Sequence, residues 1–160
     1  MTASETPLST KVDEVVRSLG RVHLRVLGTS MAPSVLPGDL VCIQRVAFRE
    51  ISLGEIVLFT RDERLFLHRV VSRVAEGETP RLITRGDRLA HNDPPVTSSE
   101  FLGRATSIER FRRRFEPSAE IRGWNRLLLS VLRASDLATF AYLRLVSCLG
   151  EAFQRKGGRL

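Results

Sequence analysis

Two side chains in this sequence could together perform nucleophilic catalysis, a serine in a turn-like segment and a histidine in a strand-like one. Ser30 lies in GTSMAP, residues 28–33, with a glycine two residues before it and a proline three residues after it. A serine hydroxyl attacks a carbonyl usefully only when a neighbouring base removes its proton and hydrogen-bond donors stabilise the oxyanion. Many Gly-Thr-Ser segments are simple turns, so Ser30 is a candidate nucleophile only if the fold brings a base to it.

Three histidines could supply that base, and their surroundings differ. His23 lies in a strand-like run seven residues before Ser30, and His91 lies in a turn beside asparagine, aspartate and proline. His68 follows the apolar LFL and precedes RVV, so a strand would hold it in a fixed geometry. A free imidazole has a pKa of about 6.5 and accepts a proton near neutral pH. His68 is therefore the candidate base, although histidines in strands also have purely structural roles.

Short β-strands are the elements that would hold these side chains. Between residues 22 and 111 the chain alternates or runs apolar over strand lengths, in VHLRVLG, DLVCIQRV, EIVLFT, LFLHRVVSRV, RLITR and LGRATSIERF. The turn formers of LPGD, SLGE, GETP and HNDPP separate these runs. The pattern predicts a mainly β fold, with a small β domain over residues 21–116 after an N-terminal helix or extension over residues 1–20.

Residues 117–160 have a helical pattern instead. At about 100° per residue, arginines gather on one face and apolar side chains on the other, namely Trp124, Leu128, Val131, Tyr142, Val146 and Leu149. This predicts an amphipathic α-helical appendage, divided in two if Ser135 caps a second helix. Charged residues, among them Arg133 and Asp136, interrupt every window long enough to cross a bilayer. We expect the apolar face to pack on the β domain with the arginines outside, and peripheral membrane contact is the alternative.

Composition excludes several classes of partner and cofactor. The 160 residues are 42% hydrophobic and 27% charged, the balance of a soluble globular protein. The net charge of +7 favours acidic partners, but no basic run is interleaved with aromatic residues, so we expect no nucleic acid partner. Cys42 and Cys148 lack metal-site spacing and are predicted to be buried small hydrophobes, with no metal and no cofactor expected. Because the first 20 residues hold no apolar core, we expect no signal peptide and a cytoplasmic protein.

Five blocks of the chain, in order, resemble the catalytic core of the signal peptidase I superfamily. They are GTSMAPSVLPGDLVCIQR, SLGEIVLFT, FLHRVV, LITRGDRLAHNDPP and FLGRAT, within residues 28–106. Bacterial signal peptidases and LexA-type self-cleaving repressors use a lysine as base. Here Lys11 and Lys156 lie outside the blocks, and His68 stands at the base position. The chain is therefore similar to the Ser/His branch of the superfamily, which includes the signal peptidases of the endoplasmic reticulum and of archaea. This resemblance implies a signal-peptidase-like or LexA-like β domain, the peptidase S24/S26 fold.

The resemblance implies a role for each candidate residue. Ser30 matches the nucleophile, His68 the general base and Asp87 of RGD the acid that orients the imidazole. Asp93 matches a second acidic position. A carboxylate on the second ring nitrogen fixes the tautomer and stabilises the imidazolium that forms. Both aspartates are also of the type that forms turns by bonding to its own backbone. We favour Asp87 over Asp93 as the orienting acid.

The neighbours of the nucleophile complete the expected site. The backbone N–H of Ser30 is the natural oxyanion donor, helped by the side chain of Thr29, and Met31 is expected to shape the loop and the substrate cleft. The chain departs from the family at Arg88 and Leu89, where the resemblance implies small polar residues. It also departs before the serine block, where family members carry a membrane anchor and this chain has 29 mostly polar residues.

These observations predict a serine endopeptidase of the signal peptidase type, which processes a precursor protein or peptide through an acyl-enzyme. The substrate is expected to bind as an extended strand beside the sheet. A catalytically silent peptide-binding module is the alternative, disfavoured because such a module is free to lose any member of the serine, histidine and aspartate set. A DNA-linked self-cleaving regulator would need a helical DNA-binding domain before Ser30, and the segment there is too short for one.

Overall fold

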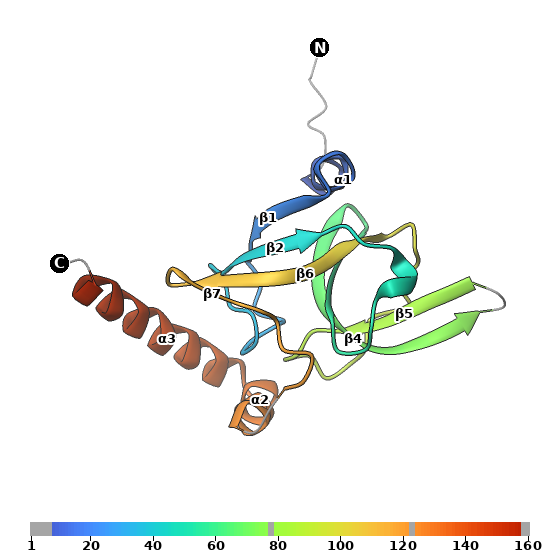
Figure 1. The fold of residues 1–160 in the computed structure, drawn as a ribbon. Coiled ribbons are helices and arrows are strands. Elements are labelled where there is room, and N and C mark those ends of the chain that lie inside the picture. The colour runs from blue at the N-terminus through green and yellow to red at the C-terminus, as the bar shows by residue number, and fades with distance from the viewer. Residues whose placement is uncertain (1–7, 77–78, 122–123, 158–160) are drawn as a thin grey trace, which may run out of the picture.

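One antiparallel sheet organises the middle of the chain (Figure 1). The computed structural model describes residues 8–76, 79–121 and 124–157. Within these ranges the sheet has seven strands, in the order β1-β2-β6-β3-β4-β5 with β7 paired to β6. The strands are β1 (Arg21–Arg25), β2 (Leu40–Gln44), β3 (Ile56–Arg61), β4 (Arg64–Glu76), β5 (Thr79–Arg85), β6 (Phe101–Arg110) and β7 (Arg113–Phe115). The prediction of a mainly β fold is confirmed.

Strand β4 changes neighbour part-way along its length. Residues 64–69 pair with β3, and from Arg69 onward the strand pairs with β5. The tight turn between β3 and β4 holds Asp62 and Glu63, both with positive φ, as the twist of a two-residue hairpin loop requires. This register places His68 opposite Val57, one residue before the change of neighbour. The backbone of His68 is therefore held by β3 on one side, and pairing with β5 begins at the next residue.

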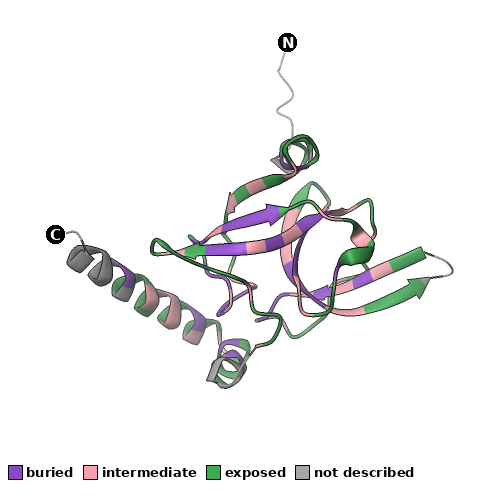
Figure 2. Cartoon of the chain, in the orientation of Figure 1, coloured by how far each residue is buried: buried purple, intermediate pink, exposed green. Residues whose placement is uncertain are grey.

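Apolar side chains are buried on both faces of the sheet (Figure 2). Side chains alternate between the faces of a strand, so successive residues of β3 enter two separate clusters. One cluster receives Ile56 and Leu58 and the other receives Val57 and Phe59. Helix α1 (Leu8–Leu19) adds its own apolar residues to the first cluster, and the short 3-10 helix η1 (Phe48–Glu50) adds Phe48 to the second. The strands that position the candidate site thus have a packed core on each side.

Two C-terminal helices, α2 (Trp124–Ala134) and α3 (Asp136–Gly157), follow one another at a large angle and pack on the loop between β1 and β2 (Figure 1). The pair is called the α2–α3 hairpin below. The shared cluster consists of Ala32, Leu36, Leu128, Leu132, Tyr142, Leu143 and Val146. Between the helices, Ser135 accepts a hydrogen bond from the N–H of Ala138 through its hydroxyl oxygen at 3.3 Å, so the predicted helix cap is confirmed. The expected packing of the appendage on the β domain is confirmed as well.

Individual side chains of the hairpin differ from the prediction. Val131, predicted on the packed face, is 55% exposed. Arg133 is exposed, as predicted, and its guanidinium also donates two hydrogen bonds to the backbone carbonyl of Asp87. The chain bends between α2 and α3, and each helix contacts the β domain with its own face. A single projection over both helices therefore misassigns residues of α2. The predictions for Trp124 and Leu149 lie outside the described side chains.

The two cysteines have different environments. Cys42 is buried in β2, as predicted, whereas Cys148 is exposed on α3, so the prediction of a buried side chain is wrong there. The flanking apolar residues of Cys148 suggested burial, but α3 presents this position away from the cluster that it shares with the β domain. In the part of the chain that the structure describes, no helix is long and apolar enough to cross a membrane.

Candidate active site

The side chains of Ser30, His68 and Asp93 form a continuous chain of hydrogen bonds. The Oγ of Ser30 lies 3.1 Å from Nε2 of His68, and Nδ1 of the same ring lies 2.7 Å from Oδ2 of Asp93. The serine comes from the loop after β1, the histidine from β4 and the aspartate from the loop after β5. Such a hydroxyl, imidazole and carboxylate series is the arrangement that general-base activation of a serine requires.

Close backbone contacts hold the loop of Ser30. The N–H of Ala32 donates to the carbonyl of Thr29, which closes a turn around the serine, and the carbonyl of Ser30 accepts the N–H of Arg88 at 2.9 Å. A Cβ on Gly86 would lie 2.8 Å from that same carbonyl oxygen. The approach of the two loops therefore requires a glycine at position 86, because any side chain would push the serine loop away.

Asp93 is fixed by more than the imidazole. Its backbone N–H donates to the carbonyl of Thr84, and the Thr84 hydroxyl donates to Oδ2 at 2.7 Å, the same oxygen that contacts His68. Partial burial opposes ionisation of this carboxyl. The hydrogen bonds from His68 and Thr84, together with the charge of Arg61, outweigh that cost and lower the pKa of Asp93 below its usual value. The carboxylate is thus kept charged and correctly aimed.

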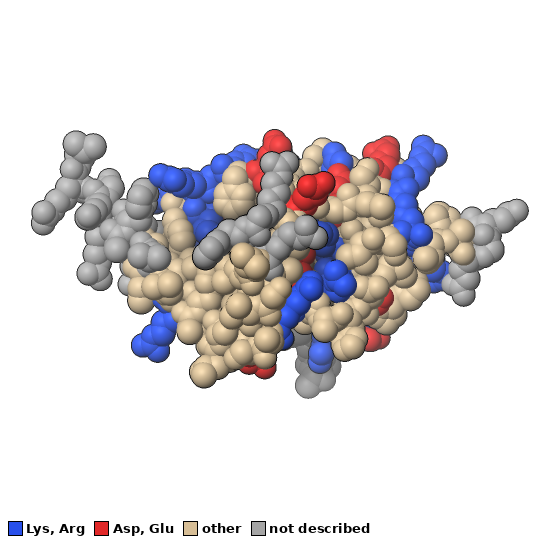
Figure 3. Space-filling view, turned by 90° about the horizontal axis from the view of Figure 1, so that it is seen from below, with Lys and Arg blue, Asp and Glu red and all other residues tan. Residues whose placement is uncertain are grey.

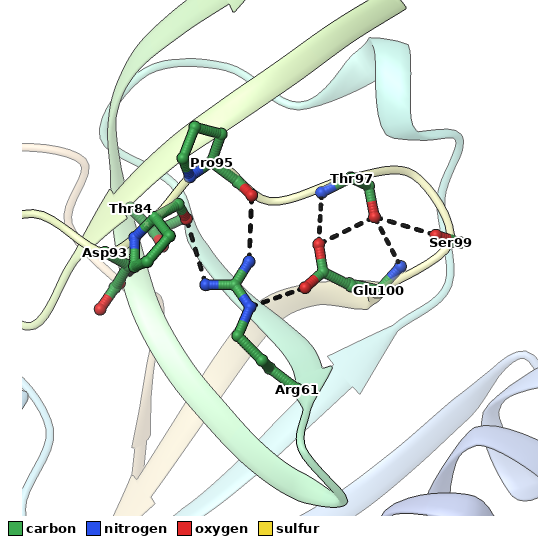
Figure 4. A network of polar contacts seen from close by, with 8 residues as sticks. Arg61, Thr84, Asp93, Pro95, Thr97, Ser99 and Glu100 are labelled. Carbon is green, nitrogen blue, oxygen red and sulfur yellow. Dashed lines mark hydrogen bonds and ion pairs between the residues drawn. The ribbon is translucent and has the colours of Figure 1, made fainter.

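Arg61 secures the loop that carries Asp93 (Figure 4). Its guanidinium donates to the backbone carbonyls of Pro94 and Pro95 and pairs with Glu100 at 2.7 Å. Burial opposes ionisation of Glu100, but hydrogen bonds from Arg61 and Thr97 prevail and lower the pKa of Glu100. The role of Arg61 was not predicted from the sequence. Two features of the sequence could have indicated it. Arg61 ends a strand-like run, and the loop that contains Pro94 and Pro95 has carbonyl groups without a matching backbone N–H at each proline.

Asp87 has a different position from the one expected. Both of its carboxylate oxygens accept hydrogen bonds from Arg69, at 2.8 Å each, and both side chains are buried. Arg69 follows His68 in β4, and neighbouring side chains of a strand point to opposite faces. A carboxylate paired with Arg69 therefore lies across the strand from the imidazole. This placement corrects the preference for Asp87, because Asp93 is the acid in contact with His68.

The remaining predicted residues flank the serine. The Thr29 hydroxyl oxygen accepts a long hydrogen bond, 3.4 Å, from the guanidinium of Arg88. Met31 is 2% exposed and belongs to the first core cluster. It also lines an apolar cleft of about 590 Å³ that leads to Ser30 and His68. Of the other histidines, His91 is exposed and no hydrogen bond links it to Ser30 in the described residues.

Two chain segments with free backbone edges border this cleft. One is the end of β1 with residues 26–28, and the other is the start of β4, residues 64–68, which pairs with β3 alone. Apolar side chains line the space between them, namely Leu24, Val26, Met31, Val41, Ile43, Leu58, Leu65 and Leu67. A sheet edge with unpaired N–H and C=O groups can accept an extended peptide as an added strand.

No group of histidine, cysteine, aspartate and glutamate side chains in the described residues is arranged to hold a metal ion. A hydroxyl, an imidazole and a carboxylate in contact with one another are the groups that serine hydrolases use.

The chain belongs to the Peptidase S24-like family, whose model matches residues 4–106. It is also similar to the signal peptidase complex catalytic subunit SEC11 of Fusarium vanettenii, with 37% identity over 71 residues, and to that of Verticillium alfalfae, with 35% identity over 71 residues. Each match covers 42% of this chain and 41% of the relative, so the chain spans less than half the length of the relatives it matches. These similarities support a peptidase-type function.

Proposed function

We propose that the protein is a serine endopeptidase of the signal peptidase type, with Ser30 as nucleophile, His68 as general base and Asp93 as the acid that orients the base. The observation that carries the proposal is the unbroken contact of 3.1 Å from hydroxyl to imidazole and 2.7 Å from imidazole to carboxylate. The family match and the names of the relatives agree with it, since both are peptidases by description.

The reaction follows from the arrangement of the three groups. Ser30 Oγ attacks the scissile carbonyl carbon while its proton passes to Nε2 of His68, and Asp93 stabilises the imidazolium. The tetrahedral intermediate then expels the amine, which takes the proton from His68, and an acyl-enzyme remains. A water molecule loses a proton to His68 and attacks the ester, which releases the acid and restores the serine. The backbone N–H of Ser30 and the Thr29 hydroxyl are the proposed oxyanion donors.

The proposed substrate is a precursor protein or peptide that binds as an extended strand along the cleft. The free edges beside residues 24–28 and 64–68 supply backbone partners, and the apolar lining favours apolar side chains near the scissile bond. The expected cytoplasmic location is part of this proposal too.

The test is cleavage of candidate precursor peptides, followed by mass spectrometry, with wild type and three variants. Ser30→Ala and His68→Ala are each expected to lose cleavage, because each removes one partner of the proton transfer. His91→Ala is the matched histidine control and is expected to cleave like wild type. A product made equally by wild type and Ser30→Ala would reject Ser30 as the nucleophile.

A catalytically silent peptide-binding module is the competing function. It requires no contact between Ser30 and His68, and no carboxylate on the second ring nitrogen. The intact series of contacts argues against it. Binding of a peptide to wild type without cleavage, and with the same affinity in Ser30→Ala, would favour the module.

Contact with an anionic membrane surface is a second proposed property, and the exposed face of the α2–α3 hairpin supports it. Large apolar side chains are from 55% to 79% exposed there, namely Leu127, Val131, Leu137, Phe140 and Leu145. Figure 3 shows a broad area with few charged side chains, with Lys and Arg at its margins. Apolar side chains bordered by arginines suit the interface of an anionic bilayer.

Sedimentation with vesicles tests this second property. Leu137→Glu combined with Phe140→Glu is expected to abolish binding to phosphatidylcholine vesicles that contain phosphatidylglycerol. Leu53→Glu, an exposed leucine of the β domain, is the control and is expected to bind like wild type. Equal binding by both proteins would reject the hairpin as the contact surface.

A further inference from the structure

Arg88 joins the loop of Ser30 to the first turn of α3. We propose that Arg88 is a positioning residue through which the α2–α3 hairpin holds the nucleophile loop in its working geometry. The inference rests on the proposed role of Ser30 and goes beyond it, because it assigns a function in the site to an appendage that lies outside the matched residues 4–106.

The backbone and the side chain of Arg88 bind different elements. Its N–H donates to the carbonyl of Ser30 at 2.9 Å. One guanidinium nitrogen pairs with Asp136 at 2.6 Å and reaches the Thr139 hydroxyl at 3.5 Å, and the other donates to Thr29 at 3.4 Å. A single residue therefore contacts the nucleophile, the residue before it and the start of α3.

The segment that carries Arg88 is itself held from two further directions. Arg133 of α2 donates to the carbonyl of Asp87 through two nitrogens, at 3.0 and 2.7 Å. Arg69 of β4 binds the carboxylate of the same aspartate. Below the serine loop, Leu132 of α2 is buried against Ala32. The hairpin thus contacts the nucleophile loop directly by apolar packing and indirectly through residues 87–88.

The length of an arginine side chain allows Arg88 to reach α3 from the turn. The resemblance implies a small polar residue at position 88, and the long side chain present here spans the distance from the turn to Asp136. An arginine has no hydrogen-bond acceptor, so Thr29 can only accept from it. The hydroxyl proton of Thr29 is then directed away from Arg88. Loss of the guanidinium would allow the Thr29 side chain to change rotamer and would remove the contact between Arg88 and Asp136.

The ion pair with Asp136 is poorly suited to a purely stabilising role. The side chain of Asp136 is 81% exposed and that of Arg88 is 19% exposed. Ion pairs with such an exposed partner add little to the stability of a fold. Loss of Arg88 is therefore expected to change the geometry of the serine loop more than the unfolding temperature.

The experiment compares Arg88→Ala, Arg88→Lys and Asp136→Asn with a matched control, Arg17→Ala. Arg17 pairs with Asp13 on α1 at the same 2.6 Å, far in sequence from the site. The first measurement is amide hydrogen exchange of residues 29–36, which reports the loop whether or not the protein is active. Arg88→Ala and Asp136→Asn are expected to exchange faster than wild type there, and Arg17→Ala at the wild-type rate.

The second measurement is the rate at which a fluorophosphonate probe modifies Ser30. In this reaction the serine oxygen bonds to phosphorus, fluoride leaves and His68 takes the proton. Arg88→Ala is expected to react roughly ten times more slowly or worse, as for a displaced nucleophile. The pH midpoint of the reaction is expected to stay unchanged, because His68 and Asp93 keep their contact. Arg88→Lys, which retains the charge, is expected to recover part of the rate.

The outcomes separate the two proposals. The positioning role is overturned if Arg88→Ala and Asp136→Asn both behave like Arg17→Ala. That result means the same rate of amide exchange at residues 29–36 and the same rate of reaction with the probe. The role is also overturned if the lower probe rate of Arg88→Ala is fully explained by a lower unfolding temperature, since simple destabilisation would then account for the result. If wild type does not react with the probe but exchange at residues 29–36 still responds to Arg88→Ala, the proposed nucleophile is rejected and the structural coupling through Arg88 stands.

Discussion

Asp87 and Asp93 lie six residues apart, yet the adjacent residues His68 and Arg69 give them different surroundings. Asp93 meets the imidazole and a threonine hydroxyl, whereas Asp87 meets a buried guanidinium. The sequence could predict that an acid follows β5 and bonds to the base. It could not predict which one, because the answer depends on the face of β4 to which each side chain points. Alternation along a strand predicts that His68 and Arg69 point to opposite faces, but it does not predict which aspartate lies on each face.

The substitutions Asp93→Asn and Asp87→Asn are expected to have opposite effects. Asp93→Asn should lower the cleavage rate by about 10²- to 10⁴-fold, because the imidazole loses its orienting charge, and should cost less stability than Asp87→Asn. Asp87→Asn leaves Arg69 buried without its partner charge and should lower the free energy of unfolding by about 3–5 kcal/mol. Peptide cleavage and urea denaturation measure the two effects. A loss of activity without loss of stability in Asp87→Asn would contradict this assignment.

The lowered pKa of Asp93 predicts a particular pH dependence of stability. A carboxyl whose folded pKa lies below its unfolded value contributes stability above the unfolded pKa, near the ordinary value of 3.8, and loses it as the pH falls through the folded pKa. The difference in unfolding free energy between wild type and Asp93→Asn should therefore be constant near neutral pH and shrink below about pH 4. Urea denaturation of both proteins across this range checks it. If the difference in unfolding free energy grows as the pH falls, the carboxylate of Asp93 does not stabilise the fold.

Among the elements, β4 and the α2–α3 hairpin position the site in different ways. The apolar run around His68 correctly predicted a strand, because burial on both faces leaves a short continuous apolar run in the sequence. Its change of neighbour at Arg69 left no such signal, since pairing depends on distant residues. The hairpin was predicted as helical for the same local reasons. Its contact with the serine loop was not, because Ala32 and Leu132 are distant in sequence and ordinary in type.

Two leucines of the hairpin provide a matched test of this packing. Leu132 is 1% exposed and packs against Ala32 and Leu36, whereas Leu137 is 79% exposed. Leu132→Ala should lower the free energy of unfolding by about 2–5 kcal/mol, through lost burial and the cavity left behind. Leu137→Ala should change it by less than about 0.5 kcal/mol. Equal effects of the two substitutions in thermal or urea denaturation would show that the hairpin does not pack as described.

Over the whole molecule, the basic charge is carried almost entirely by arginine. The chain has 25 lysines and arginines, and only Lys11 and Lys156 are lysines. Lys11 is exposed on α1, and no lysine lines the cleft beside Ser30 in the described residues. This distribution could be used from the sequence alone, because both lysines lie outside the blocks that resemble the signal peptidase core. The orientation of the arginines, several of which bind backbone carbonyls, required the structure.

Chemical modification of the whole protein tests this distribution. Reductive methylation of lysines should leave the cleavage rate within about twofold of wild type, because no lysine takes part in the proposed proton transfer. Modification of histidines with diethyl pyrocarbonate should abolish cleavage, and His68 should be the site that a bound peptide protects. Loss of activity on lysine methylation, prevented by a bound peptide, would contradict the assignment of His68 as base.

The position of the hairpin in the chain sets the order in which the site is completed during synthesis. Ser30, His68 and Asp93 all precede α2, and the side chains that cover the serine loop come from residues 128–146. Chains fold from the N-terminus as they leave the ribosome. The strands can therefore pair while the two helices are still being translated or remain inside the exit tunnel. The nascent protein holds all three polar groups of the site before it holds the cover over the serine loop, so that loop is covered only after α2 and α3 have been made.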